Sequence, residues 1–310
     1  MKILCVGEAS FNITLPVDKF IKENNKVEIS DKKVSGGANI YKAATLLASF
    51  GLDTYLAASL GNDYYGNFLK EELKEKKVNT KYLYQDNYKE TSSSYIITSK
   101  ENGSRTVLKA QTKDLKYKEI LKLDESFDYV LIDGYDLDAS LDAIKQNEEA
   151  KIILDASSKN DGVIKLAKKA DYIVASKDFA ESFTGKTIDL SDFKTLIEVY
   201  NDIKDAFKKA HLIIVLNDGS SFTYQDGYKL IPSIKSSKAF SGAFDIYLGS
   251  LLYFIAKGED LLIAMRKASI AGALSREEEK IPLLETINQR FNENKWKVST
   301  CTENMRQLLG

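Results

Sequence analysis

Residues 236–255, SSKAFSGAFDIYLGSLLYFI, pass from small and polar residues into the pattern of an apolar helix. Gly242 stands just before the predicted helix, and Asp245 stands in its first turn. The free N–H groups and the dipole of a helix N-terminus favour an anion there. A carboxylate in that turn either caps the helix or, beside a bound phosphate, takes the proton of a hydroxyl, as phosphoryl transfer requires. The spacing alone leaves both interpretations of Asp245 open.

The histidine count narrows the chemistry further. The chain has one histidine, His211, just before the strand-like run LIIVLND, where we expect it to end a helix or to pack at its edge. Histidine-based metal clusters and Ser-His-Asp triads need an imidazole in the site. Acid–base work is therefore predicted to fall to a carboxylate.

Composition restricts partners and compartment. The 44 basic and 45 acidic residues leave a formal charge of −1, and no Lys/Arg-rich block predicts binding to nucleic acid or to an anionic membrane. No run reaches the roughly 20 apolar residues of a membrane helix, and the N-terminus is a poor signal peptide. Cys5 and Cys301 lie far apart, as expected for unpaired thiols in a reducing cytoplasm.

Strand-like and helical patterns alternate along most of the chain. Helices are expected at 39–51 and 63–77, and strands at 2–9, 53–61, 129–134, 151–157, 172–176 and 212–218. This alternation predicts an α/β fold of three layers, α/β/α, with a mainly parallel central sheet. We expect one domain over residues 1–310, with the ligand site at the carboxyl ends of the strands.

Two segments interrupt the alternation. Residues 12–34 and 88–109 have strand patterning without an intervening helix, and the second contains the hairpin signal ENGS. They predict a small sheet that projects from the main domain as a lid over the ligand. A surface hairpin without a function is the alternative.

Several stretches, in order, resemble the ribokinase-like (PfkB) carbohydrate kinase family over nearly the whole chain. They are SGGANIYKAATLLASFGLDTYLAASLGNDYYGNFLKEELKEKKV, ENGSRTVLK, ADYIVASKDFAESFTG, FSGAFDIYLGSLL and ASIAGALS. GSRT and VASKD are most similar to the ketohexokinase branch. The resemblance implies an ATP- and Mg²⁺-dependent kinase acting on a hydroxyl of a sugar or sugar-like molecule.

The resemblance gives Asp245 the role of catalytic base and makes the turn Gly242, Ala243, Phe244 and Asp245 the anion hole. Phe244 occupies the position of the third motif glycine, and Ala239–Phe240 replace its leading Asp-Thr pair. If that position requires a positive φ, phenylalanine costs about 1–2 kcal/mol. If it is already helical, the N–H survives and the ring is expected to crowd the γ-phosphate.

On the substrate side, the resemblance implicates Asn12, Gly36, Gly37, Asn39, Lys42 and Arg105. Asn12 replaces an acidic residue that binds sugar hydroxyls, and the family's asparagine position falls at Lys42, one helical turn after Asn39. Lys42 in the pocket would suit an anionic or phosphorylated substrate; alternatively it faces solvent and Asn39 makes the contact. The two glycines are expected to let the backbone approach the ligand, and Arg105 to close over phosphate oxygens from the lid.

On the nucleotide side, the implied contacts are Ser176, Asn217, Asp218, Gly219, Ala271 and Ser275. The family's Asn-x-x-Glu, which organises magnesium, is SKDF here, so the metal ligands stay unassigned, with Asp178 and Glu181 as available carboxylates.

Two other functions remain open: a non-catalytic relative that binds a sugar or nucleotide as a sensor, and a nucleoside kinase. The apolar lid arms ITLPV and SSYIITS predict a homodimer through the lid.

Overall fold

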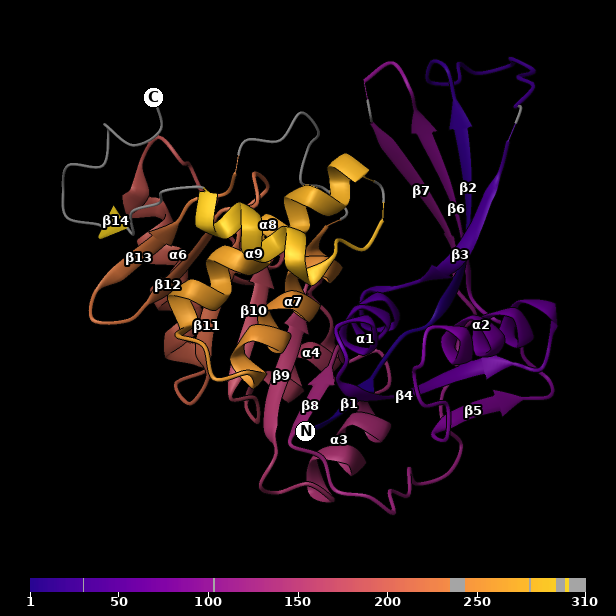
Figure 1. Ribbon diagram of the computed structural model, residues 1–310, viewed down its shortest axis with the longest axis horizontal. Helices are drawn as coiled ribbons and strands as arrows, with labels where there is room; N and C mark the ends of the chain where they lie inside the picture. Colours follow the sequence, from indigo (N-terminus) through magenta and orange to yellow (C-terminus); the bar gives the residue numbers. More distant parts are fainter. Residues whose placement is uncertain (30, 103, 235–242, 279, 294–298, 301–310) are drawn as a thin grey trace.

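The predicted parallel strands form the centre of a ten-stranded sheet (Figure 1). We describe a computed structural model over residues 1–29, 31–102, 104–234, 243–278, 280–293 and 299–300. The strand order is β14-β13-β12-β11-β10-β9-β8-β1-β4-β5. The strands from β11 to β5 in this order are all parallel, whereas β12, β13 and β14 are added antiparallel. The strand bounds are β1 Lys2–Val6, β4 Asp53–Gly61, β5 Leu83–Asp86, β8 Tyr129–Ile132, β9 Lys151–Ala156, β10 Tyr172–Ser176, β11 His211–Val215, β12 Ser221–Tyr224, β13 Tyr228–Ile231 and β14 Ser299–Thr300.

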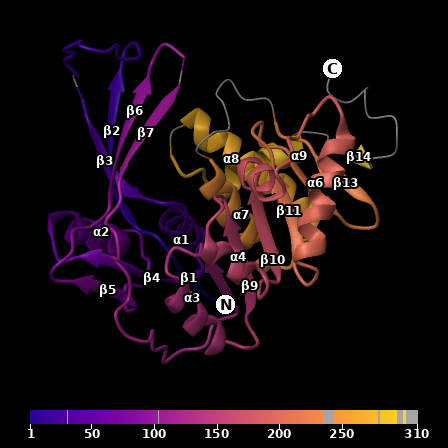
Figure 2. The same cartoon turned by 180° about the vertical axis from the view of Figure 1, so that it is seen from behind.

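Helices cover both faces of this sheet, which confirms the predicted three layers (Figures 1 and 2). The alternation within β1 decides which face each side chain joins: Ile3 and Cys5 belong to one core cluster, and Leu4 and Val6 to the other. The first cluster packs under α1 Asn39–Ser49, α2 Tyr64–Glu75, α7 Phe244–Ala256, α8 Leu261–Glu278 and α9 Leu284–Glu293. The second packs under α3 Leu137–Lys145, α4 Asp161–Ala167, α5 Lys177–Thr184 and α6 Phe193–Ala206.

A four-stranded sheet projects from the main body, as predicted from the two interrupting segments (Figure 1). We call this sheet the lid. It is formed by β2 Ser10–Val17, β3 Lys33–Gly37, β6 Ser93–Ser99 and β7 Arg105–Ala110, in the order β3-β2-β6-β7. Its strands reach beyond the predicted arms, beginning at Ser10 and ending at Gly37 and Ala110.

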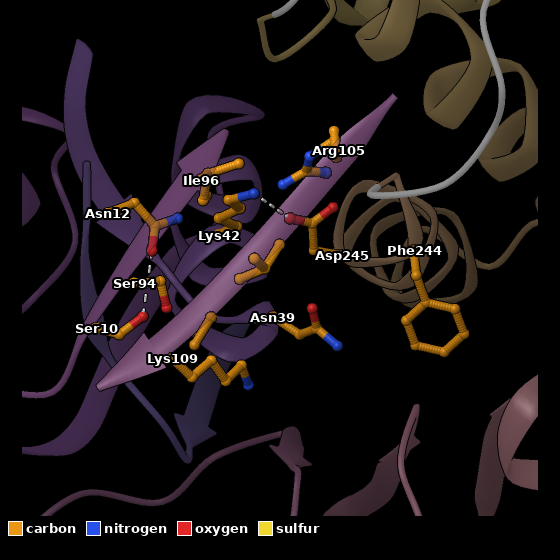
Figure 3. Close-up of a pocket in the computed structure, with 12 residues that line it drawn as sticks. Ser10, Asn12, Asn39, Lys42, Ser94, Ile96, Arg105, Lys109, Phe244 and Asp245 are labelled. Atoms are coloured by element: carbon orange, nitrogen blue, oxygen red, sulfur yellow. Dashed lines mark hydrogen bonds and ion pairs between the residues drawn. The ribbon is translucent and has the colours of Figure 1, made fainter. Parts of the chain in front are cut away.

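Helix α7 is the most apolar of the described helices, and it lies between two others. Eleven of its thirteen residues are buried, and it packs against both α1 and α8. The predicted apolar helix therefore exists, beginning at Phe244. Its first two residues, Phe244 and Asp245, line one pocket together with residues of the lid (Figure 3).

His211 does not end a helix, which was one of the two positions expected for it. It is the first residue of β11 rather than the end of a helix, and its Nε2 lies 2.9 Å from Thr223 Oγ1. Withdrawal from water lowers its pKa. None of the helices in the described part of the chain is long and apolar enough to cross a bilayer.

Candidate active site

Asp245 is buried in the first turn of α7 and uses both carboxylate oxygens. Oδ1 accepts the backbone N–H of Ile246 at 2.8 Å, and Oδ2 lies 2.8 Å from Lys42 Nζ. The N-cap residue of this helix is Ala243, whose methyl side chain cannot accept a hydrogen bond from the first turn. Asp245 thus complements the helix N-terminus while its second oxygen faces a pocket. The interpretations as helix-stabilising acid and as base are compatible in this geometry.

That pocket is a cavity of about 160 Å³ between α7, α1 and the lid (Figure 3). Eight of the twelve described residues that line it are polar or charged, and Asp245 is the one carboxylate among them. The residues that line it are Ser10, Asn12, Ala38, Asn39, Lys42, Ser94, Ile96, Arg105, Val107, Lys109, Phe244 and Asp245.

Helix α1 supplies Asn39 and Lys42 to the pocket. Lys42 does not face away into solvent: it forms the ion pair with Asp245, with a third of its side chain exposed. Asn39 Nδ2 donates to Asp155 Oδ2 at 2.9 Å and to Ser157 Oγ at 3.0 Å. Asp155 is buried at the end of β9, and burial together with the nearby charge of Asp245 raises its pKa. Asn39 therefore links the pocket to the carboxyl ends of the parallel strands.

The lid contributes rows of side chains with the period of two that strands impose. On β7, Arg105, Val107 and Lys109 all line the pocket. Lys109 is paired with Ser94 of β6, and Ser94 with Asn12 of β2, so these three residues form one row across the lid. The same sheet face thus presents a polar row at one end and Arg105 at the other, which makes the projecting sheet a wall of the site.

Gly36 and Gly37 are not among the residues that line the pocket. A Cβ on Gly37 would come within 2.2 Å of Asn12 Oδ1, and a Cβ on Gly36 would meet the ring of Tyr41. The absence of a Cβ at these two glycines makes room for protein side chains, Asn12 among them; their expected approach to the ligand stays a prediction.

Phe244 is the first residue of α7, so its backbone is helical and the strain expected for a positive φ does not arise. Its half-buried ring packs against the core cluster under α7 and α8, and Figure 3 shows it pointing away from the Asp245 carboxylate and from the lid. Gly242, Ala239 and Phe240 lie outside the described residues.

The residues expected at the nucleotide lie apart from this pocket. Ser176 caps α5, accepting the N–H of Phe179 and donating to the carbonyl of Ser157. Asn217, Asp218 and Gly219 form the turn after β11, where Gly219 has φ +83°. Ala271 and Ser275 are buried on α8. The hydroxyl of Ser269, on the same helix, hydrogen-bonds to the Gly219 carbonyl, which brings the turn and α8 together.

Magnesium has no protein cage in the described part of the chain, where no three His, Cys, Asp or Glu side chains surround a common point. Magnesium is commonly held by one or two carboxylates together with substrate phosphates, so a three-residue cluster is not required for it to bind. Glu181 accepts the N–H of Ile188 at 2.7 Å and lies 3.4 Å from Lys177, while Asp178 is exposed.

Three polar lining residues were not predicted from the sequence: Ser10, Ser94 and Lys109. Lys109 could have been predicted, because it follows Arg105 by four residues in a strand and therefore lies on the same face of the sheet. Ser10 and Ser94 carry no signal of their own. Their place follows from strand pairing between distant segments.

The model of the pfkB family carbohydrate kinases matches residues 1–281. The chain belongs to this family. The predicted family and the predicted enzyme class, a kinase, are thereby confirmed. The matched residues include the lid, α1 and the first turn of α7, and so every described residue that lines the pocket.

Individual relatives of this pfkB chain differ in the substrates that their names give. Ketohexokinase from Mus musculus is 22% identical over 86% of this chain and 92% of its own length. A nucleoside kinase from Methanocaldococcus jannaschii is 25% identical over 95% and 98%, respectively. The structure of Arabidopsis thaliana ribokinase with ribose and ATP has a TM-score of 0.76 at 16% identity, covering 96% of this chain and 99% of that one. The fold is therefore the ribokinase-like fold, as predicted.

Proposed function

We propose that this protein transfers the γ-phosphoryl group of ATP to a hydroxyl of a sugar or sugar-like small molecule, with Asp245 as general base. The observation that carries the proposal is the position of Asp245, a buried carboxylate in the first turn of α7 that faces a polar pocket under the lid. Phosphoryl transfer needs a base beside the acceptor hydroxyl and donors for the charge on the moving phosphate.

Each part of the pocket has a role in this reaction. The N-terminal N–H groups of α7, which begins at Phe244, stabilise the charge that develops on the transferred group. Asn12, Asn39 and Ser94 hydrogen-bond the acceptor, because amides and hydroxyls can both donate and accept. Lys42 must yield Oδ2 of Asp245 when the hydroxyl arrives, so that the carboxylate can receive its proton.

ATP binds, in this proposal, along the carboxyl ends of β10 and β11, where Ser176 and the turn Asn217–Asp218–Gly219 lie, with Ala271 and Ser275 of α8 on the base side. Magnesium, when bound, neutralises charge on the nucleotide phosphates. Arg105 reaches the phosphate oxygens from the lid, since a guanidinium binds them in a bidentate manner.

Two specific observations favour other functions. The similarity to a nucleoside kinase, which extends over 95% of this chain, favours a nucleoside as acceptor. The ion pair that occupies Asp245 Oδ2 favours a sensor that binds its ligand without turnover.

A screen of neutral sugars, charged sugars and nucleosides distinguishes the three candidate functions: sugar kinase, nucleoside kinase and sensor. Thermal shift identifies the ligands, and coupled ADP release with ATP and Mg²⁺ identifies turnover above the rate without acceptor. We expect ADP release with at least one sugar-like acceptor. Turnover with nucleosides alone would make the protein a nucleoside kinase, and binding of both ligands without ADP release would make it a sensor.

We also propose a cytoplasmic homodimer that pairs through the lid. An apolar row crosses all four lid strands on the side opposite the pocket. It is formed by residues paired in register: Val34, Ile13, Tyr95 and Leu108. Val34, Tyr95 and Leu108 are 42%, 38% and 55% exposed, and an apolar row of this kind is typical of a surface that a partner covers.

A further inference from the structure

The pocket wall formed by β7 carries positive charges at two separate points, and a neutral acceptor would need only one of them. Arg105 and Lys109 lie on the same face of β7 and both line the pocket. They are four positions apart in the strand, which places their Cα atoms roughly 13 Å apart. Figure 3 shows Arg105 beside Asp245 and Lys109 at the far end of the strand. Cations therefore stand at both ends of the site.

At the end of the pocket near Asp245, the proposed reaction explains both cations. Lys42 pairs with Asp245, and Arg105, whose side chain has no ion pair or hydrogen bond among the described residues, is free to meet the transferred phosphoryl group. These two residues fit the reaction itself and say nothing about the rest of the acceptor.

The far end has a cation that the reaction does not require. Lys109 lies in one row with Ser94 and Asn12, which are both buried and polar. Its Nζ forms a long ion pair, 3.7 Å, with the Glu8 carboxylate, and its side chain is 61% exposed, so the ammonium group keeps donors that an anion in the pocket can reach. An anion bound at this point would gain charge-assisted hydrogen bonds from Lys109 and neutral ones from its row.

We propose that the acceptor is a sugar with a phosphate or carboxylate group at the end opposite the hydroxyl that is phosphorylated, and that Lys109 binds this group. The inference rests on the proposed kinase function. The product then carries one anionic group at each end of the pocket, with Arg105 and Lys42 at the new phosphate and Lys109 at the old group.

Matched acceptors and three variants test the inference. The acceptors are ribose and ribose 5-phosphate, fructose and fructose 6-phosphate, and gluconate, so that phosphate, carboxylate and neutral forms are separated. The variants are Lys109→Gln, Lys109→Arg and Lys100→Gln. Lys100 is a matched control, because it lies in the turn after β6, is 56% exposed and pairs with Asp18 rather than facing the pocket. Binding is measured by calorimetry without nucleotide, and turnover by ADP release.

We expect an anionic acceptor to bind at least tenfold more tightly than its neutral partner. Lys109→Gln should weaken that binding by about 10- to 100-fold, Lys109→Arg should restore most of it, and Lys100→Gln should leave it unchanged. Raising the salt concentration should weaken only the anionic acceptors.

The outcomes separate the inference from the proposed function. Turnover of neutral sugars, with equal effects of Lys109→Gln on neutral and anionic acceptors, would overturn the inference and leave the kinase. Loss of anion binding in Lys109→Gln, with no ADP release from any acceptor, would support the anion site and overturn the kinase.

Discussion

Asp245 and Lys42 show how two residues far apart in the sequence depend on each other. Each was identified in the sequence as a candidate on its own, and the alternatives left open were cap or base for one, and pocket or solvent for the other. The structure joins them in one ion pair at 2.8 Å. A carboxylate buried in this way needs a partner, because removing a charge from water is costly unless it is paired. Lys42 therefore stabilises Asp245 in the absence of a hydroxyl.

The replacement at Phe244 is expected to affect packing more than chemistry. Because its backbone is helical and its ring packs on the core, Phe244→Gly should destabilise the fold by about 2–3 kcal/mol, less than the loss for a fully buried ring. Turnover and ATP affinity should change by less than about threefold, since a single N–H donor, worth 100-fold or more, is retained. Denaturant unfolding and ADP release measure the two effects.

Phe244→Leu is the matched control, because it keeps an apolar side chain on the core and should recover most of the stability. A clear rise in the turnover of Phe244→Gly, in a folded protein, would show that the ring obstructs the phosphate.

At the scale of helices and strands, the carboxyl ends of β1 and β8 meet around a carboxyl group. Asp133, just after β8, accepts the N–H groups of Glu8 and Tyr135 at 2.9 and 2.8 Å. The loss of water around it nevertheless raises its pKa to about 8. The folded state therefore holds a proton on Asp133 that the unfolded chain releases near pH 4.

This pKa predicts a loss of stability with rising pH. Between the ordinary carboxyl pKa and about 8, the native state binds more protons than the unfolded state, so the free energy of unfolding falls as the pH rises, and levels off above it. Wild type should lose more stability than Asp133→Asn between pH 6 and 8 in urea unfolding. Equal slopes for the two proteins would contradict the shifted pKa.

The sequence predicted most of these elements because their patterns are local. The alternation in β1 and the helical period of α1, which ends before Gly51 at φ +83°, can be read from neighbouring residues. The contact of Asn39 with Asp155 could not be read in this way, because it depends on how α1 packs over β9. The same is true of the row formed by Asn12, Ser94 and Lys109, which needs the strand order of the lid.

At the scale of the whole molecule, the outer face of the lid is the surface expected to join two chains. Leu108→Lys places a charge at the β7 end of the apolar row and should convert a dimer into a monomer, as charges on exposed sheets prevent association. Leu283→Lys is the control, because Leu283 is 66% exposed outside the lid. Light scattering at tens of micromolar measures the mass. A wild-type monomer at that concentration would contradict the dimer.

The most direct test of the central claim is the turnover of Asp245→Asn. The change is nearly isosteric and removes the base, so ADP release with a substrate found in the screen should fall by about 100-fold or more, while ATP binding and the unfolding midpoint stay near those of wild type. Asp138→Asn removes an exposed carboxylate from the first turn of α3 and controls for the lost helix-dipole interaction. Turnover of Asp245→Asn above about a tenth of wild type, far more than loss of a general base allows, would leave Asp245 as a residue that only stabilises its helix.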